Sequence, residues 1–177
     1  MGKAGQSQHM AFFRILLLIV AAFAITACGG SKFKTYDGPE VTQIQVHKAD
    51  RKMYLLHNDK VLKSYDVALG FAPTGHKQVE GDGKTPEGTY YISHRNPKSR
   101  YHLSLGVSYP NEADMAFAAE ADKSPGGDIM IHGQPNAVGD EVVLRGDWTA
   151  GCIAVSNPEI EELWSAVALG TTVEIRP

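Results

Sequence analysis

The chain has 177 residues, a formal net charge of −3 at pH 7, and 43% hydrophobic residues. This length suits a single domain, and the hydrophobic content is high enough for a buried core, which excludes a disordered chain. The mild acidity, without a run of Lys and Arg, excludes the basic footprint of a nucleic-acid-binding protein. We therefore expect no nucleic-acid partner.

Residues 1–27 have the pattern of a signal peptide. Lys3, His9 and Arg14 provide a basic or titratable start without an acidic residue, and an apolar run follows over residues 15–24. A transmembrane helix needs roughly 20 apolar residues, so this run is too short for a span and is typical of a secretory signal. The pattern predicts export from the cytoplasm.

Cys28 is a candidate lipid anchor. It follows Ile25-Thr26-Ala27, and the four residues resemble a bacterial lipobox, in which the cysteine is acylated and becomes the new N-terminus. Two or more acyl chains anchor a protein stably to a membrane. We expect a lipoprotein of the cell envelope that faces the periplasm, held at the outer membrane where the host has one. The alternative is an ordinary cleaved signal in which Cys28 is incidental.

Residues 28–40 are predicted to form a flexible tether, because their Gly-Gly-Ser and Asp-Gly-Pro sequences favour turns over regular structure. Residues 41–177 are predicted to form one domain. Alternating apolar residues at its start predict an antiparallel meander of three strands with one buried face. These strands are expected at residues 41–46, 53–56 and 61–69.

The rest of the domain is predicted to be strand-rich, with one or two short helices. An Ala-rich stretch at residues 112–121 favours a short helix. A clearer helix follows Ser156, which can cap it, and Pro158 suits its first turn. The sequence thus predicts a mainly β fold. Further strands are expected at residues 89–92, 102–107, 128–131 and 172–175.

The only cysteine besides the anchor candidate Cys28 is Cys152, so it enters an oxidising compartment without a partner, where structural cysteines are normally paired. His132 ends an apolar strand and precedes Gly133, an arrangement that can present a side chain to a cleft. An imidazole beside the thiol would take its proton and generate the thiolate nucleophile. A lone buried cysteine is more often a small hydrophobe, so each residue alone is a weak signal.

Other residues near Cys152 are further candidates. The peptide N–H groups of Gly151 and Cys152 are candidates to bind a developing oxyanion, since glycine allows close approach of a substrate. Arg145 is expected either to hold the loop before the nucleophile or to contact substrate charge. No Cys/His cluster has the spacing of a zinc site, so we expect no metal and no cofactor.

Taken together, these segments resemble a known signature. Sixteen residues (133–148) separate Ile131-His132 from Thr149-Ala150-Gly151-Cys152, and this pattern resembles the signature of the YkuD family of L,D-transpeptidases. Residues 65–70 and 83–90 resemble the same domain. The resemblance covers residues 41–177, and it implies a β-sandwich-like catalytic fold that acts on peptidoglycan stem peptides.

The resemblance also implies a role for each matching residue. Cys152 corresponds to the nucleophile and His132 to the general base. Gly133 corresponds to the position whose backbone carbonyl orients the imidazole. Gly151 corresponds to the glycine that flanks the oxyanion site, and Thr149 to the Ser/Thr of the motif.

Two positions depart from the common motif. Ala150 replaces a second histidine, and Ala154 replaces an Asn or Arg. Both changes remove polar groups beside the nucleophile, which leaves the identity of the acceptor open. The Gly-Cys-Ile-Ala-Val sequence resembles a YafK-like branch of the family, some members of which hydrolyse peptidoglycan links rather than form them.

These residues are consistent with three functions. The first is a cysteine acyltransferase that forms a thioester with a stem peptide and passes it to an amine, in cell-wall biogenesis. The second is an L,D-endopeptidase or carboxypeptidase, in which water takes the acyl group. The third is a non-catalytic lipoprotein that binds peptidoglycan. The intact pair of Cys152 and His132 argues against the third.

Overall fold

The computed structural model describes residues 31–139 and 141–177. The predicted signal peptide and Cys28 lie outside the described residues. Residues Phe33 to Pro177 form one compact unit. Within the described part of the chain, no helix has both the length and the hydropathy that crossing a bilayer requires.

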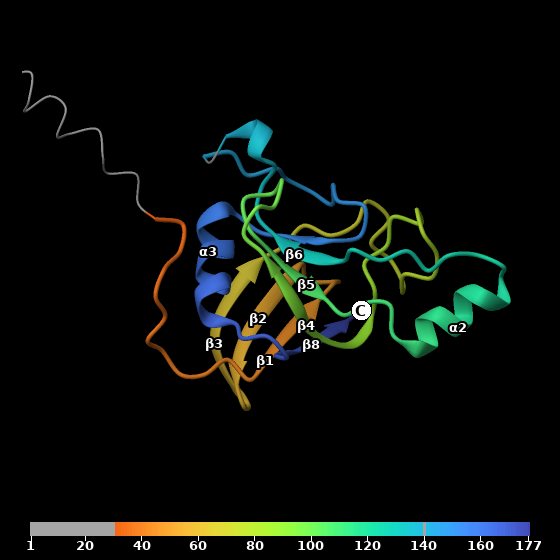
Figure 1. Ribbon diagram of the computed structural model, residues 1–177, viewed down its shortest axis with the longest axis horizontal. Helices are drawn as coiled ribbons and strands as arrows, with labels where there is room; N and C mark the ends of the chain where they lie inside the picture. The colour runs from red at the N-terminus through yellow and green to blue at the C-terminus, as the bar shows by residue number, and fades with distance from the viewer. Residues whose placement is uncertain (1–30, 140) are drawn as a thin grey trace, which may run out of the picture. The chain divides into compact units, whose positions relative to one another are not determined.

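Eight strands pair in the order β3-β2-β1-β8-β4-β5-β6-β7 and form a curled sheet (Figure 1). The mainly β fold predicted from the sequence is confirmed. The strands are β1 Gln43–His47, β2 Lys52–His57, β3 Lys60–Asp66, β4 Gly88–Asn96, β5 Ser104–Val107, β6 Met130–His132, β7 Ile153–Ala154 and β8 Thr172–Arg176.

Strands β1, β2 and β3 form the predicted antiparallel meander. In β1, Ile44 and Val46 are buried and alternate with half-exposed neighbours, because successive side chains of a strand point to opposite faces. The C-terminal strand β8 lies between β1 and β4, parallel to β1 and antiparallel to β4. It therefore joins the meander to the strands that carry the candidate catalytic residues.

The chain that follows edge strand β3 pairs with the segment around β7, the strand at the other edge of the sheet. Directly after β3, Ala68 bridges Ala154 of β7, and Gly70 bridges Thr149. The segment that follows β3 therefore lies beside the segment that carries Cys152. Strand β7 contains only two residues, too few to show an alternating pattern, and the sequence did not predict it.

Helix α3, Asn157–Ala166, is the predicted helix that follows the cysteine. The carboxylate of Glu159 accepts hydrogen bonds from the N–H and the hydroxyl of Ser156, which fixes the start of the helix. Ile160 and Leu163 are fully buried against the sheet. Trp164 of the same helix is only partly buried and packs at the edge of the core.

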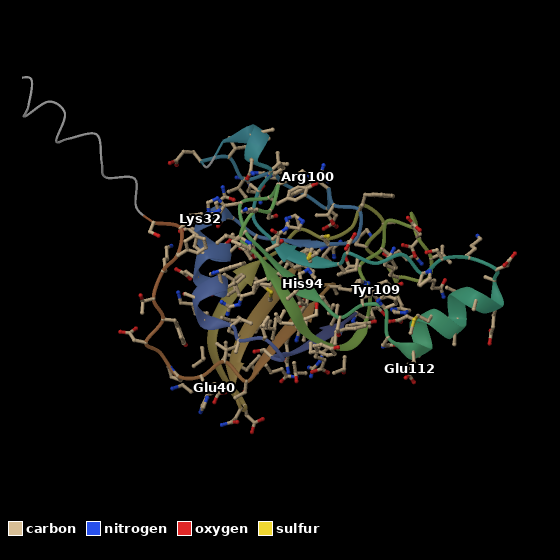
Figure 2. The ribbon with its side chains drawn as sticks, viewed as in Figure 1. Lys32, Glu40, His94, Arg100, Tyr109 and Glu112 are labelled. Carbon is tan, nitrogen blue, oxygen red and sulfur yellow. The ribbon has the colours of Figure 1, made fainter. Side chains whose placement is uncertain are left out.

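Helix α2, Glu112–Glu120, confirms the Ala-rich prediction and begins at an Asn111 cap. Its Asp114 is buried and turns toward the sheet, where Oδ2 accepts from the hydroxyl of Tyr90 at 3.0 Å. Tyr109 lies on the side of the sheet where α2 begins (Figure 2), and its hydroxyl donates to the carbonyl of Pro125. These contacts hold α2 to the domain through polar groups, since its own apolar residues Met115 and Phe117 are exposed.

The segment before β1, residues 33–40, contains no helix or strand. Its Phe33 ring lies 6.1 Å from the ring of Trp164, and Lys34 Nζ lies 2.9 Å from Glu161 Oε2. Both partners belong to α3. This part of the predicted tether therefore contacts the outer side of that helix.

Candidate active site

Cys152 and His132 are brought together by two neighbouring parallel strands. In the β6–β7 pair, Ile131 is in register with Ile153, and His132 with Ala154. Both isoleucines are fully buried in the core. Because side chains alternate along a strand, His132, Ala154 and Cys152 share the opposite face. Two residues that are twenty positions apart in the sequence thus become diagonal neighbours.

A backbone carbonyl sets the orientation of His132. The Nδ1 atom lies 2.7 Å from the carbonyl oxygen of Gly133. Since a carbonyl oxygen only accepts, Nδ1 carries the proton and Nε2 is the acceptor of the neutral ring. This is the contact that the family resemblance implies for Gly133, and it replaces the carboxylate that orients the base in many catalytic triads.

Two aromatic rings enclose the imidazole of His132, which is only 3% exposed. The Tyr101 ring lies at 4.4 Å with a 31° tilt, and the Trp148 ring lies at 5.7 Å nearly edge-on. This burial lowers the pKa of His132, although the bond to Gly133 acts in the opposite direction. The base is therefore neutral at neutral pH. The sequence gave no signal for Tyr101, because an isolated tyrosine in a turn has no pattern.

Cys152 rests as a thiol rather than a thiolate. It is half-buried, and its Sγ lies 3.4 Å from the carbonyl oxygen of Asp128, to which the S–H donates. Burial raises the pKa of Cys152, while a backbone hydrogen bond from Met130 lowers it and the Asp128 charge raises it further. With a neutral His132 beside it, the resting pair is uncharged, and the thiol must lose its proton during the attack.

The turn before the nucleophile requires glycine at position 151. Gly151 has a φ of +137°, and a Cβ there would lie 2.7 Å from the carbonyl oxygen of Lys84. Thr149 is buried, and its Oγ1 accepts from Gly151 N at 3.1 Å and donates to the carbonyl of Cys152 at 2.7 Å. Thr149 thus ties the turn together. The N–H of Gly151 is engaged in this turn, so of the predicted pair only the N–H of Cys152 stays a candidate to bind an oxyanion.

The Gly-rich loop between β3 and β4, residues 67–87, faces this turn and is held by a buried lysine. Lys48 Nζ donates to the carbonyls of Gly75 and Thr85 and to Glu87 Oε1, at 2.6, 2.9 and 2.7 Å. Burial lowers the pKa of Lys48, although Glu87 opposes the change. The sequence did not identify this lysine, because a buried lysine and a surface lysine look alike in a turn.

Arg145 and Asp147 lie in the loop between His132 and Cys152 but differ in role. Asp147 accepts from Arg51 NH2 at 2.8 Å and from the N–H of Leu69 at 3.0 Å, so it anchors the loop. Arg145 is exposed, and no residue within 31–139 or 141–177 forms an ion pair with it. It borders a cavity of about 580 Å³ whose lining includes Ala154 but neither Cys152 nor His132 among its described residues.

Across the described residues, no group of three or more His, Cys, Asp or Glu side chains is arranged to hold a metal ion.

The family model of the L,D-transpeptidase catalytic domain, YkuD, matches residues 42–175. Among characterised sequences, the chain is similar to YafK of Escherichia coli strain K12, which is provisionally named an L,D-transpeptidase. The two are 30% identical over 130 residues, which cover 70% of this chain and 46% of YafK.

Two solved structures share the fold. The helical cell shape determining protein Pgp2 of Campylobacter jejuni is 27% identical with a TM-score of 0.58, and the match covers 83% of this chain and 51% of Pgp2. Bd1075 of Bdellovibrio bacteriovorus is 27% identical with a TM-score of 0.53, over 81% of this chain and 50% of Bd1075. The chain thus spans about half the length of the relatives that it matches.

Proposed function

The chain belongs to the YkuD family of L,D-transpeptidase catalytic domains, and on that premise we propose that it is an enzyme that modifies peptidoglycan through a thioester on Cys152. The proposed acyl donors are peptidoglycan stem peptides. Cys152 is the nucleophile, His132 is the general base, and Gly133 positions that base.

In the first step, Cys152 Sγ attacks the carbonyl carbon at the L-centre of the diamino acid in a stem peptide. A C–S bond forms as His132 Nε2 takes the thiol proton. Proton transfer accompanies attack because the resting pair is uncharged, with the pKa of Cys152 raised and that of His132 lowered. The N–H of Cys152 donates to the oxyanion that develops.

The second step releases the terminal D-residue. The oxyanion collapses, the C–N bond to that residue breaks, and His132 returns its proton to the leaving amine. The product is an acyl-enzyme in which the peptide is held as a thioester on Cys152. The imidazole is neutral again and is ready to act a second time.

Deacylation completes the cycle. In the transferase reaction, an acceptor amine attacks the thioester carbonyl, His132 takes a proton from that amine, and the released thiolate recovers it. In the alternative, water is the acceptor and the enzyme is an L,D-endopeptidase or carboxypeptidase. Ala150 and Ala154 support this alternative, because they lack the polar groups that would help to position an acceptor peptide.

One observation carries the proposal. The 2.7 Å contact between His132 Nδ1 and the Gly133 carbonyl leaves Nε2 as the proton acceptor, on the sheet face that Cys152 shares. A non-catalytic peptidoglycan-binding domain has no need of a base held in one tautomer beside an otherwise unpaired thiol.

Trapping the thioester tests the proposal. After brief incubation with a stem tetrapeptide, intact-mass spectrometry of the wild-type protein should show the mass of the acyl group added at Cys152. A carbapenem-type β-lactam, an acylating agent that does not depend on stem-peptide recognition, should add its own mass at the same residue. Both adducts should be absent from Cys152→Ala, and an adduct that persists there would show that another residue is the nucleophile.

We further propose that the enzyme works in the cell envelope, anchored to a membrane through acylated Cys28 and facing the periplasm. The support for this location is the lipobox-like sequence before Cys28. The two-acyl anchor would hold the domain near its polymeric substrate.

A further inference from the structure

A cavity of about 580 Å³ opens near Cys152, and its lining includes Ala154, two residues further along the chain. Its floor includes Ala154 and Ala68, which bridge each other across the meeting edges of the sheet. Ala154 follows Cys152 by two residues and shares its face, so the floor begins roughly 7 Å from the nucleophile along the strand. We call this hollow the Ala154 cavity.

The carboxylates that line the Ala154 cavity are already neutralised or hydrogen-bonded. Asp147 is paired with Arg51 at 2.8 Å, and Asp66 with Lys52 at 2.7 Å. Glu159 accepts from the N–H and the hydroxyl of Ser156 at the start of α3. Two of the three carboxylates are therefore neutralised by a cation, and the third is held by Ser156 at the start of the helix.

Two arginines line the cavity, and of these Arg51 is paired with Asp147, whereas Arg145 has no ion-pair partner within residues 31–139 and 141–177. The backbone is held on both sides of Arg145. Before it, the N–H of Leu144 donates to the buried amide oxygen of Gln134 at 2.9 Å. After it, Asp147 is bound to Arg51 and to the N–H of Leu69. These contacts fix the place of Arg145 at the cavity, where its guanidinium is available to pair with a carboxylate.

The remaining walls of the cavity suit a short peptide. Val67, Val143 and Val155 contribute apolar surface, and the alanine floor leaves room for a side chain. One extended residue spans at most about 3.6 Å. A carboxylate one or two residues from the scissile carbonyl would therefore fall within the cavity.

We propose that the Ala154 cavity is a carboxylate subsite in which Arg145 binds a free carboxylate of the stem peptide, one or two residues from the bond that Cys152 attacks. Arg145 is then a specificity-determining residue that contacts the substrate. The inference rests on the proposed function for the identity of the peptide, and the geometry supplies the charge and the place. Three carboxylates of a diaminopimelate-containing stem tetrapeptide satisfy this chemistry: that of the terminal D-residue, that of the diamino acid, and the α-carboxylate of the γ-linked D-glutamyl residue before it.

Peptide binding to the Cys152→Ala protein, which cannot turn substrate over, separates these three sources. The probes are a diaminopimelate-containing stem tetrapeptide and three matched peptides, each amidated at one of the three carboxylates. Amidation of the recognised carboxylate should weaken binding about tenfold or more, because a charge-assisted pair is lost. Amidation of either other carboxylate should have little effect.

Adding Arg145→Gln to Cys152→Ala should produce the same loss and remove the discrimination, so that the acid and its amide bind equally. The matched control is Arg176→Gln, an exposed arginine of β8 that pairs with Glu174 within its own strand and should keep the discrimination. Ala154→Leu should weaken the binding of all four peptides, since it fills the floor of the cavity. The subsite is refuted if none of the amides binds more weakly than the acid, if no peptide binds, or if Arg145→Gln still discriminates.

These results are independent of catalysis. If the peptides bind with Arg145-dependent discrimination but the wild-type enzyme forms no thioester, the proposed function fails and the subsite stands. If the thioester forms and Arg145→Gln changes nothing, the proposed function stands and the subsite fails.

Discussion

At the scale of single residues, the chemistry depends on the pairing of strands β6 and β7. Only two residue pairs are in register there, and this pairing places Cys152 and His132 on one face of the sheet. The sequence was sufficient to nominate both residues, because a lone thiol after a signal peptide and a His-Gly at a strand end are each visible locally. It was not sufficient to find Tyr101, which reaches the imidazole only through the fold and contributes to the burial that lowers the pKa of His132.

The protonation states of Cys152 and His132 predict how the reactivity of the thiol depends on pH. The pKa of His132 is lowered, so its neutral form, the one that accepts a proton, persists below the pH at which an ordinary histidine becomes charged. We expect the rate of Cys152 alkylation by iodoacetamide in the wild type to fall on acidification only below that ordinary pKa. In His132→Ala the reaction should be markedly slower and should rise only at alkaline pH, because burial raises the pKa of the thiol itself.

Alkylation rates measured by mass spectrometry across the pH range check this prediction. Asp128→Asn is an informative second variant, because it removes the charge that raises the pKa of Cys152 while keeping the side-chain shape. It should shift the profile slightly toward lower pH. Identical profiles for the wild type and His132→Ala would show that the base has been misassigned.

At the scale of elements, the long strands and both helices were predictable, because each carries a pattern of its own. The meander shows alternation in β1, and α3 combines a capping residue with an apolar stripe. Strand β7 was not predictable, because two residues have no periodicity and its partners lie elsewhere in the chain. The position of β8 between β1 and β4 also depends on long-range pairing rather than on its own sequence.

The contacts of Lys48 with the Gly-rich loop predict how a substitution at Lys48 changes the free energy of unfolding. Lys48 is 3% exposed, and its Nζ atom holds two carbonyls of the loop together with Glu87. Lys48→Met should lower the free energy of unfolding by about 3 kcal/mol, because the substitution leaves Glu87 and the two carbonyls without their donor. The activity at Cys152 should fall as well, since the carbonyl of Lys84 in this loop abuts Gly151.

Urea denaturation and turnover measured on the same preparation check the role of Lys48. Lys123→Met is the matched control, because Lys123 is exposed just after α2 and should change the unfolding free energy by less than about 0.5 kcal/mol. Equal stabilities for the two variants would mean that Lys48 does not hold the loop.

At the scale of the whole molecule, the sequence predicts an anchored domain, and the described residues contain the domain but not the anchor. The single compact unit from Phe33 to Pro177 contains every proposed catalytic residue. The segment before β1 contacts α3 through Phe33 and Lys34.

The anchor is tested separately from catalysis. Cys28→Ala should abolish lipidation and move the protein from the membrane fraction to the soluble fraction of the envelope, because the acyl chains that bind the bilayer are lost. Fractionation and intact-mass measurement of the recovered protein check this. Cys152→Ala is the control and should remain in the membrane fraction, and equal membrane retention of Cys28→Ala would contradict the lipoprotein proposal.

Mass spectrometry of muropeptides after incubation with the purified protein shows whether Cys152 and His132 together perform acyl chemistry on peptidoglycan. We predict that the wild type changes the stem peptides, giving crosslinked products if an amine takes the acyl group or shortened products if water does. Both kinds of product should disappear together in Cys152→Ala and in His132→Ala, while Arg176→Gln should leave them unchanged. Unaltered muropeptides with the wild type, or products that persist in Cys152→Ala, would mean that this pair does not carry out the proposed reaction.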